Sequence, residues 1–312
     1  MSTRVHDTGS QLSGRTAVVT GSGAGLGRAE ALALAEQGAN VVVNDLGPDA
    51  DHVVAEIKQR GGNAVAVTGD VGSWATGEEL VSAALDSFGS LDIVVNNAGI
   101  IRDAMLFNLS EKDWDDVIHV HLKGHAAVSR AAAVHWRRRS KELSAPIYGR
   151  VVNTSSEAFL FGSVGQPNYA AAKAGIVALT LATSRALAKY GITANAICPR
   201  ARTAMTVKVF TDEPIETPGE LDPFAPERVA TFVTYLASPR AASISGQVFV
   251  VYADLVALMA APVVEQKFTA AEGTFTVAEL DATLTPYFAD RAPGQTFAAT
   301  SVAALDTTAT NA

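Results

Sequence analysis

The feature that most restricts the fold is a regular alternation of short apolar runs with longer helical patterns. Short apolar runs between amphipathic helices are typical of strands that are buried on both faces of a parallel sheet. The sequence therefore predicts an α/β fold, with a doubly wound open parallel sheet and helices on both faces. The predicted strands are 16–20, 40–45, 64–68, 91–95, 149–154, 192–197 and 247–252. The predicted helices are 26–37, 50–60, 76–88, 111–139, 168–190 and 226–237.

The repeats continue to residue 252 without a linker, which predicts a single domain over residues 1–312. We expect a core of about 14–253 and a C-terminal extension, 254–312, with one helical pattern from Val277 to Phe288. Its Ala/Thr-rich tail, from about Thr296, is expected to fray. Residues 210–226 hold four of the twelve prolines, which predicts a long loop or lid.

Composition excludes several classes of protein. The 312 residues carry a formal charge of −8, whereas a general nucleic-acid binder needs a basic surface. The single cysteine, Cys198, allows neither an internal disulfide nor a cysteine-cluster metal site. The N-terminus lacks the apolar run of a secretory signal, and Asp254 and Pro262 interrupt the longest apolar stretch. We therefore expect a cytoplasmic protein that binds no membrane.

The first strand ends in a glycine cluster that opens the first helix. Gly21, Gly25, Leu26 and Gly27 occupy this junction. Small residues there let the backbone turn tightly and approach a pyrophosphate, which the free N–H groups of a helix N-terminus can bind. The junction predicts a dinucleotide site of the Rossmann type, although this glycine spacing alone can also be a simple turn.

Asp45 ends the second strand, where an acidic residue can accept hydrogen bonds from an adenosine ribose. A carboxylate there repels the 2′-phosphate of NADP, so we expect NAD. Arg28 offers a possible counter-charge and leaves NADP as the less favoured alternative. Asp45 can also be only a turn residue ahead of Gly47 and Pro48.

Tyr169 and Lys173 lie four residues apart in a predicted helix, so they share one face. A tyrosine has an ordinary pKa near 10, and a neighbouring ammonium that lowers this pKa would make the phenol a general acid/base. Such a pair is more often a solvated helix face. Here Ser155 and Ser156 stand at the end of a predicted strand, where a hydroxyl can orient a substrate oxygen.

Together these residues resemble the short-chain dehydrogenase/reductase family over residues 14 to about 253. The shared motifs, in family order, are Thr20 to Gly27, Asp70-Val71, Asn96 to Gly99, Ser156 and Tyr169-x-x-x-Lys173. The resemblance implies that Tyr169 is the acid/base, that Lys173 lowers its pKa and binds the nicotinamide ribose, and that Ser156 holds the reacting oxygen. It also implies that Asp70 and Val71 lie along the adenine and that Asn97, Ala98 and Gly99 border the cofactor.

Two positions depart from the family pattern. His121 replaces an asparagine that usually helps to hold a proton-relay water, and histidine can donate or accept in the same relay. Pro199-Arg200 replaces Pro-Gly after the sixth strand, which makes the nicotinamide-side loop with Thr203 atypical.

A narrower resemblance is to the (3R)-hydroxyacyl-CoA dehydrogenase region of the peroxisomal multifunctional β-oxidation enzyme, a 17β-hydroxysteroid dehydrogenase branch, and its bacterial relatives. The segments 23–38, 43–47 and 101–103, with Trp114 and 121–124, carry it. It implies NAD-dependent oxidation of a 3-hydroxyacyl-CoA, with a steroid-derived acyl group as one option. The family resemblance further implies a homotetramer or homodimer built on helices 111–139 and 168–190.

Several other readings remain open. His119, His121 and His125 suggest a metal site, but no third ligand has a supporting spacing, so we expect none. The basic run after Trp136 is a solvated helix end or a contact for a coenzyme A phosphate. The alternative functions are an NADPH-dependent 3-oxoacyl reductase or hydroxysteroid dehydrogenase, and a non-catalytic nucleotide sensor.

Overall fold

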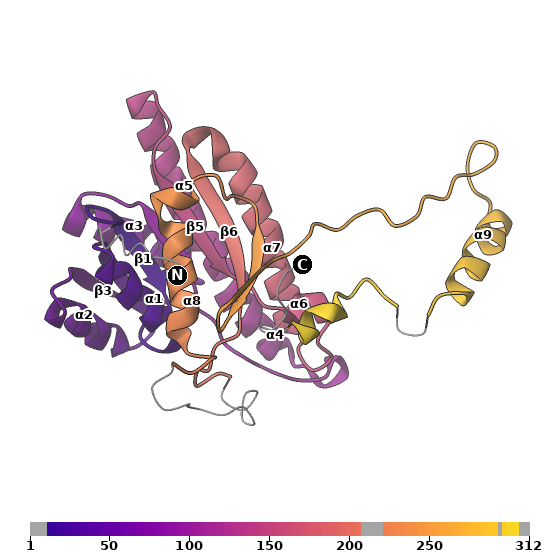
Figure 1. Cartoon of the computed structure of the whole chain (residues 1–312), viewed down its shortest axis with the longest axis horizontal. Coiled ribbons are helices and arrows are strands. Elements are labelled where there is room, and N and C mark those ends of the chain that lie inside the picture. Colours follow the sequence, from indigo (N-terminus) through magenta and orange to yellow (C-terminus); the bar gives the residue numbers. More distant parts are fainter. Residues whose placement is uncertain (1–10, 207–220, 293–294, 306–312) are drawn as a thin grey trace, which may run out of the picture.

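The computed structural model describes residues 11–206, 221–292 and 295–305. One eight-stranded sheet has the order β3-β2-β1-β4-β5-β6-β7-β8, in which only β8 runs antiparallel, against β7 (Figure 1). This confirms the predicted α/β fold. The strands are β1 (Thr16–Thr20), β2 (Asn40–Asp45), β3 (Ala64–Thr68), β4 (Ile93–Asn96), β5 (Gly149–Thr154), β6 (Ile192–Pro199), β7 (Val248–Tyr252) and β8 (Leu255–Leu258).

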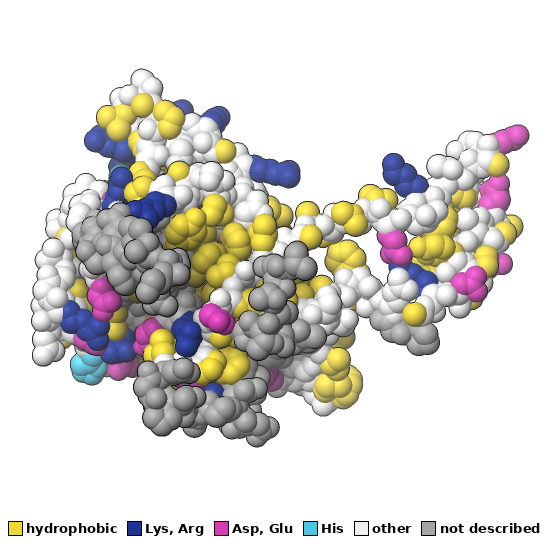
Figure 2. All heavy atoms as spheres, in the orientation of Figure 1, with side chains coloured by type: hydrophobic (Ala, Val, Ile, Leu, Met, Phe, Trp, Pro, Cys, Tyr) yellow, Lys and Arg dark blue, Asp and Glu magenta, His cyan; other side chains and the backbone are white. Residues whose placement is uncertain are grey.

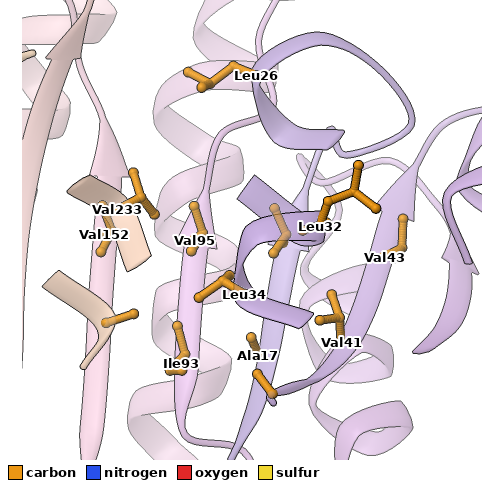
Figure 3. Close-up of a cluster of buried hydrophobic side chains, with 14 of the residues drawn as sticks. Ala17, Leu26, Leu32, Leu34, Val41, Val43, Ile93, Val95, Val152 and Val233 are labelled. Atoms are coloured by element: carbon orange, nitrogen blue, oxygen red, sulfur yellow. The ribbon is translucent and has the colours of Figure 1, made fainter. Parts of the chain in front are cut away.

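Helices cover both faces of the sheet. On one face, leucines of α1 pack with Val233 of α8 over valines of the central strands (Figure 3). On the other face, α3, α5 and α7 contribute a second cluster that contains Leu80, Trp136 and Leu187. The helices are α1 (Gly25–Glu36), α2 (Asp49–Gln59), α3 (Trp74–Phe88), α4 (Glu111–Ile118), α5 (Gly124–Leu143), α6 (Ala158–Phe161), α7 (Pro167–Leu187), α8 (Pro226–Ala237) and α9 (Val277–Ala289).

The predicted helix 111–139 is interrupted. A π-helical turn, η2 (His119–Lys123), separates α4 from α5. Residues Ile118, His119, Lys123 and Gly124 keep right-handed helical dihedrals, so the chain continues in one direction through the turn. Turns of this type often occur at functional sites, and this one brings His121 inward, where it is buried.

The C-terminal extension leaves the body and returns to it. After β8, residues 259–276 run outward to α9, which stands apart from the sheet layers (Figures 1 and 2). No residue of α9 is buried, and a capping box formed by Thr276 and Glu279 begins the helix. The Arg291–Glu265 ion pair then ties the end of α9 to the outgoing chain.

The expectation of a fraying tail from about Thr296 is wrong for residues 299–305. These residues form the short helix η5 (Thr300–Ala304) and its flanks, and Val302 is 5% exposed in a cluster with Tyr252 and Val250. This contact was not evident from the composition of the tail, because it is made by only a few side chains and by backbone carbonyls.

One long apolar helix and the predicted lid can be compared with the structure. Within the described residues, Pro167–Tyr190 matches the length and mean hydropathy of a membrane-crossing helix, but it is α7 followed by η3 (Ala188–Tyr190), and it packs on β5 and β6. A helix that covers the core of this fold meets the same criteria. Most of the predicted lid, 210–226, falls in the range 207–220, which lies outside the described residues.

Candidate active site

A cavity of about 450 Å³ opens at the carboxyl ends of the strands, between β1 and β4, where the strand order reverses. Open α/β sheets bind ligands at this point. Nearly every predicted site residue lines it, including Gly21, Gly25, Leu26, Asp45, Asp70, Val71, Asn97, Ala98, Gly99, His121, Ser156, Tyr169, Lys173 and Thr203. The structure therefore brings together residues that lie up to 182 positions apart in the sequence.

The glycine loop is shaped so that side chains cannot replace its hydrogens. A Cβ on Gly21, whose φ is +60°, would lie 2.6 Å from the Cα of Ala98. A Cβ on Gly27 would lie 2.3 Å from the carbonyl oxygen of Gly21. Gly27 is absent from the cavity wall and instead lets the loop pack on the helix, while Gly25, with a φ of +54°, faces the cavity.

Asn97 locks this loop in place. Its Nδ2 donates to the carbonyl oxygens of Thr20 (3.1 Å) and Gly21 (3.0 Å). The backbone N–H groups of Asn97 and Ala98 donate to the Thr20 hydroxyl oxygen at 3.0 and 3.2 Å. The donor groups of Asn97 are thus committed to the loop, and the residue borders the cavity while it holds the glycine backbone.

Asp45 lies at the end of β2, beside the glycine loop. Its Oδ2 accepts from the Gly23 N–H at 2.9 Å, and its Oδ1 accepts from the Leu46 N–H at 2.7 Å. Arg28, the possible counter-charge, points elsewhere, because its guanidinium makes a forked contact with Glu56 of α2 at 2.6–3.0 Å.

Asp70 and Val71 line the next part of the cavity. The Asp70 carboxylate contacts His119 Nε2 at 2.7 Å and accepts from the Gly72 N–H at 2.9 Å. These contacts lower the pKa of Asp70 despite its partial burial. His119 is thus paired with a carboxylate across the cavity rim.

The Tyr169, Lys173 and Ser156 side chains meet where β5 ends and α7 begins. Lys173 is 2% exposed and its Nζ donates to the Thr154 carbonyl at 2.6 Å. Its Nζ lies 5.3 Å from the centre of the Tyr169 ring. The Ser156 Oγ accepts from the Ala158 N–H at 3.2 Å and hydrogen-bonds to Tyr169. The four-residue spacing thus places both side chains on one face, as predicted.

The predicted lowering of the Tyr169 pKa is wrong for the protein without cofactor. Burial of the phenol raises its pKa to about 12, and the hydrogen bond from Ser156 only partly opposes this. Burial also lowers the pKa of Lys173 to about 7, because the ammonium has lost its water. Removal of water disfavours the charged form of each group.

These motifs agree with comparisons against known proteins. Residues 15–214 match the family model described as short chain dehydrogenase. The chain belongs to the short-chain dehydrogenase family. It is therefore an oxidoreductase of the NAD(P)-using kind.

Relatives of known name or structure support this membership. The chain is 55% identical over 296 residues to hydroxyacyl-CoA dehydrogenase ChsB1 of Mycobacterium tuberculosis, covering 93% of each protein. It is 44% identical to mouse peroxisomal multifunctional enzyme type 2 over 72% of this chain and only 30% of that longer protein. A crystal structure of a short chain dehydrogenase from Mycobacterium avium superposes with a TM-score of 0.80 at 42% identity, covering 91% of this chain and 97% of the other.

His121 contacts both Ile100 and Tyr169 in the site. Its Nε2 lies 2.7 Å from the carbonyl oxygen and 3.0 Å from the amide nitrogen of Ile100. Its ring packs edge-on against Tyr169, with 5.1 Å between ring centres. Burial and the nearby Lys173 lower the pKa of His121 to about 3, so its ring is neutral at physiological pH.

The other departure from the family pattern, Arg200, makes contacts that the sequence did not reveal. It leaves the end of β6 and pairs with Glu157, the residue after Ser156, at 2.7 Å. Thr203, on the same loop, lines the cavity, where its Cγ2 would lie 3.4 Å from a Cβ on Gly25.

Sequence reasoning missed Asn168, which is fully buried beside Tyr169. Its Nδ2 donates to the carbonyl oxygens of Arg102 (3.0 Å) and Asp113 (3.1 Å), and its Oδ1 accepts from the Tyr169 N–H. Asn168 therefore fixes the start of α7 to the chain on the opposite side of the cavity. Its position next to Pro167 at a helix start was the only available signal.

The structure also bears on the histidine metal site and on the basic run after Trp136. In the part of the chain that the structure describes, no three His, Cys, Asp or Glu side chains group as metal ligands. Trp136 is buried and donates to the Leu91 carbonyl near the amino ends of the strands. The basic run that follows it therefore lies away from the cavity, near the amino ends of the strands.

The residues present fit a dinucleotide. Gly21 and Gly25 leave a cradle at the N-terminus of α1 that a Cβ would obstruct or strain. Asp45 and Asp70 place acceptors along the cavity, and Lys173 places an amine at its end. Backbone N–H groups at a helix start suit a pyrophosphate, and the carboxylates suit hydroxyl and amino donors.

Proposed function

We propose that this protein oxidises the 3-hydroxyl group of an acyl-CoA thioester with NAD as hydride acceptor. The observation that carries the proposal is a single cavity that joins the glycine cradle to Ser156, Tyr169 and Lys173. The thioester class follows from the relative that shares 55% identity over 93% of both chains and is named a hydroxyacyl-CoA dehydrogenase. A steroid-derived acyl group is the bulkier option.

Each of the three side chains has a separate task. The Ser156 hydroxyl orients the substrate oxygen, because it already lies in hydrogen-bond contact with Tyr169. Tyr169 takes the proton from the hydroxyl oxygen of the substrate, and the carbon that bears this oxygen becomes the carbonyl carbon of the ketone. Lys173, held by the Thr154 carbonyl, stabilises the phenolate from its fixed position one helical turn away.

Ionisation of Tyr169 depends on the cofactor. When bound, oxidised NAD supplies the hydride acceptor and a positive charge. A nearby positive charge favours a phenolate, which counteracts the burial that raises the pKa of Tyr169 to about 12. His121 is neutral at physiological pH, so its ring adds no positive charge that would oppose the charge of the cofactor.

The choice of NAD over NADP rests on charge. Asp45 places a carboxylate at the end of β2, where it would repel a 2′-phosphate. Arg28 does not offset this repulsion while its Nε and one terminal nitrogen are paired with Glu56. The following residue, Leu46, is 66% exposed and brings no charge.

We also propose a homo-oligomer that forms through α5 and α7. A shallow depression of about 250 Å³ lies between these helices, lined by small residues including Ala126, Ala133 and Ala182. Small side chains allow helices of a second copy to approach closely. Light scattering during gel filtration should give a dimer or tetramer mass, and a monomer mass would contradict this proposal.

The main test compares wild type with Tyr169→Phe. Oxidation of a panel of straight-chain and steroid-derived 3-hydroxyacyl-CoA thioesters is followed by absorbance of reduced NAD. We expect turnover to fall by about 10²–10⁴-fold, while calorimetry shows nearly unchanged NAD binding. Tyr190→Phe, at the end of η3, is the matched control. Retained turnover in Tyr169→Phe would refute the assignment.

A second test concerns the cofactor. Wild type should prefer NAD to NADP in kcat/KM, and Asp45→Ala should reduce this preference. Glu56→Gln, which weakens the hold on Arg28, should also improve use of NADP. A wild type that prefers NADP would instead favour a 3-oxoacyl reductase.

A further inference from the structure

The C-terminal docking segment, residues 299–305, packs beside the turn that carries Ser156. Figure 1 shows this yellow segment next to α6. The Ala299 N–H donates to the Leu160 carbonyl at 2.9 Å, and the Tyr252 hydroxyl donates to the Leu305 carbonyl at 2.5 Å. Val302 is 5% exposed among apolar side chains from α6 and β7. The C-terminal docking segment therefore packs against the folded core of the protein.

Arg200 joins this segment to the active-site turn. Its Nε and one terminal nitrogen each donate to Glu157 at 2.7 Å, in a forked ion pair. The same terminal nitrogen donates to the Val302 carbonyl at 2.8 Å. The guanidinium also lies over the Tyr252 ring, 4.5 Å from its centre. Only arginine offers a planar fork for a carboxylate, a further donor and a flat face for a ring.

The position of Glu157 links its contact with Arg200 to the active site. Glu157 follows Ser156 directly and is the N-cap of α6. The Ser156 Oγ accepts from the Ala158 N–H, one residue beyond Glu157. The Glu157 side chain is 10% exposed and the Arg200 side chain 17%, so water can replace neither partner easily. A displacement of Glu157 therefore moves the Ser156 hydroxyl relative to Tyr169.

We propose that Arg200 is a positioning residue for the alcohol oxidation and that the C-terminal docking segment holds it in place. The end of β6, the Ser156 turn and the docking segment then form one unit, which fixes Ser156 against Tyr169. This inference rests on the proposed function, since it assigns a role in that reaction. A misplacement of about 1 Å in such a group can cost about 10²-fold in rate.

The test uses three variants of the full-length enzyme. Arg200→Lys keeps the charge but loses the fork, and deletion of residues 299–312 removes the docking segment. Arg15→Lys is the matched control, because Arg15 also pairs with a carboxylate, Asp92 at 3.0 Å, and lies over a tyrosine ring, 3.7 Å from its centre. Arg15 precedes β1 and so lies at the amino ends of the parallel strands, whereas Arg200 follows β6 at their carboxyl ends.

We expect Arg200→Lys to lower kcat by about tenfold or more, with an unchanged Kd for NAD. The isotope effect with substrate deuterated at the alcohol carbon should increase, because chemistry becomes slower than product release. Amide hydrogen exchange in peptides covering residues 155–161 should accelerate in Arg200→Lys and in the deletion. Combining both changes should cost less than the sum of the two separate effects, because both act on the position of Arg200.

The outcomes separate this inference from the proposed function. A wild type that oxidises no hydroxyacyl-CoA would refute the proposed function. An active wild type, with Arg200→Lys matching the Arg15→Lys control in kcat and isotope effect, would overturn the positioning role. Accelerated exchange without a change in kcat would overturn it too, because Arg200 would then only stabilise the fold.

Discussion

Glu30 allows a quantitative test of the fold, because it is a carboxyl group buried without a partner. It lies on α1 and is 0% exposed, and neither side-chain oxygen has a hydrogen-bond partner in the described structure. Burial raises its pKa from 4.5 to about 8. The folded protein therefore keeps a proton on Glu30 at pH values where the unfolded chain has released it.

The sign of the pH effect follows from proton linkage. Between pH 4.5 and 8 the folded state binds one more proton at Glu30 than the unfolded state, so the free energy of unfolding falls as pH rises. Each pH unit corresponds to about 1.4 kcal/mol, which gives roughly 3 kcal/mol by pH 7 and roughly 5 kcal/mol by pH 8. Below pH 4.5 both states are protonated and Glu30 adds no pH dependence.

The perturbation is Glu30→Gln, which keeps the shape and removes the titration. Urea unfolding at pH 5, 6, 7 and 8 gives the free energy of unfolding of both proteins. We expect the variant to gain stability over wild type as pH rises, by several kcal/mol across this range. Glu36→Gln, at the exposed end of the same helix, should change stability by about 1 kcal/mol or less throughout. Parallel curves for wild type and Glu30→Gln would refute the reasoning.

Three other substitutions test the site. Gly27→Ala forces a Cβ to within 2.3 Å of the Gly21 carbonyl oxygen, so calorimetry should show much weaker NAD binding. In the control Gly165→Ala the new Cβ has open space around it, so this variant should bind NAD normally. Asn168→Ala leaves two partly buried carbonyls and the Tyr169 N–H without their partner, so urea unfolding should show a loss of about 1–3 kcal/mol, together with a lower kcat. Lys173→Met removes a buried amine whose pKa is lowered to about 7. This variant should raise the Tm of the cofactor-free protein, most strongly below pH 7, where the buried amine of the wild type is charged. The same variant should abolish turnover. Failure of the Tm to rise would contradict the burial cost of Lys173.

The sequence predicted those parts of the fold that depend on local pattern. Parallel strands buried on both faces are continuous apolar runs, so seven strands were placed within about two residues. The strand β8 was missed, because its residues alternate between half-buried and exposed and lie within a longer apolar stretch. The π-helical turn η2 was missed because the helical pattern of the sequence continues through residues 119–123 without an interruption.

The site residues were found because the family motifs keep them in order, but their electrostatics were not. The pKa of Tyr169 depends on how much water the folded chain removes, and residue spacing does not encode this quantity. Likewise, Arg200 was noticed as a departure from the family pattern, but its partner Val302 lies 102 positions away in the chain. Contacts of this kind arise only from tertiary packing.

The electrostatics of Tyr169 and Lys173 lead to a final prediction about cofactor charge. Burial raises one pKa to about 12 and lowers the other to about 7, so the neutral pair is favoured over the ion pair without cofactor. The absorbance of tyrosinate, taken as wild type minus Tyr169→Phe, should show no Tyr169 phenolate near neutral pH. Oxidised NAD should lower the midpoint of this titration by about one pH unit or more, because its positive charge favours the phenolate. Reduced NAD lacks that charge and should leave the midpoint nearly unchanged, so equal midpoints with both forms would show that charge does not prepare Tyr169 for catalysis.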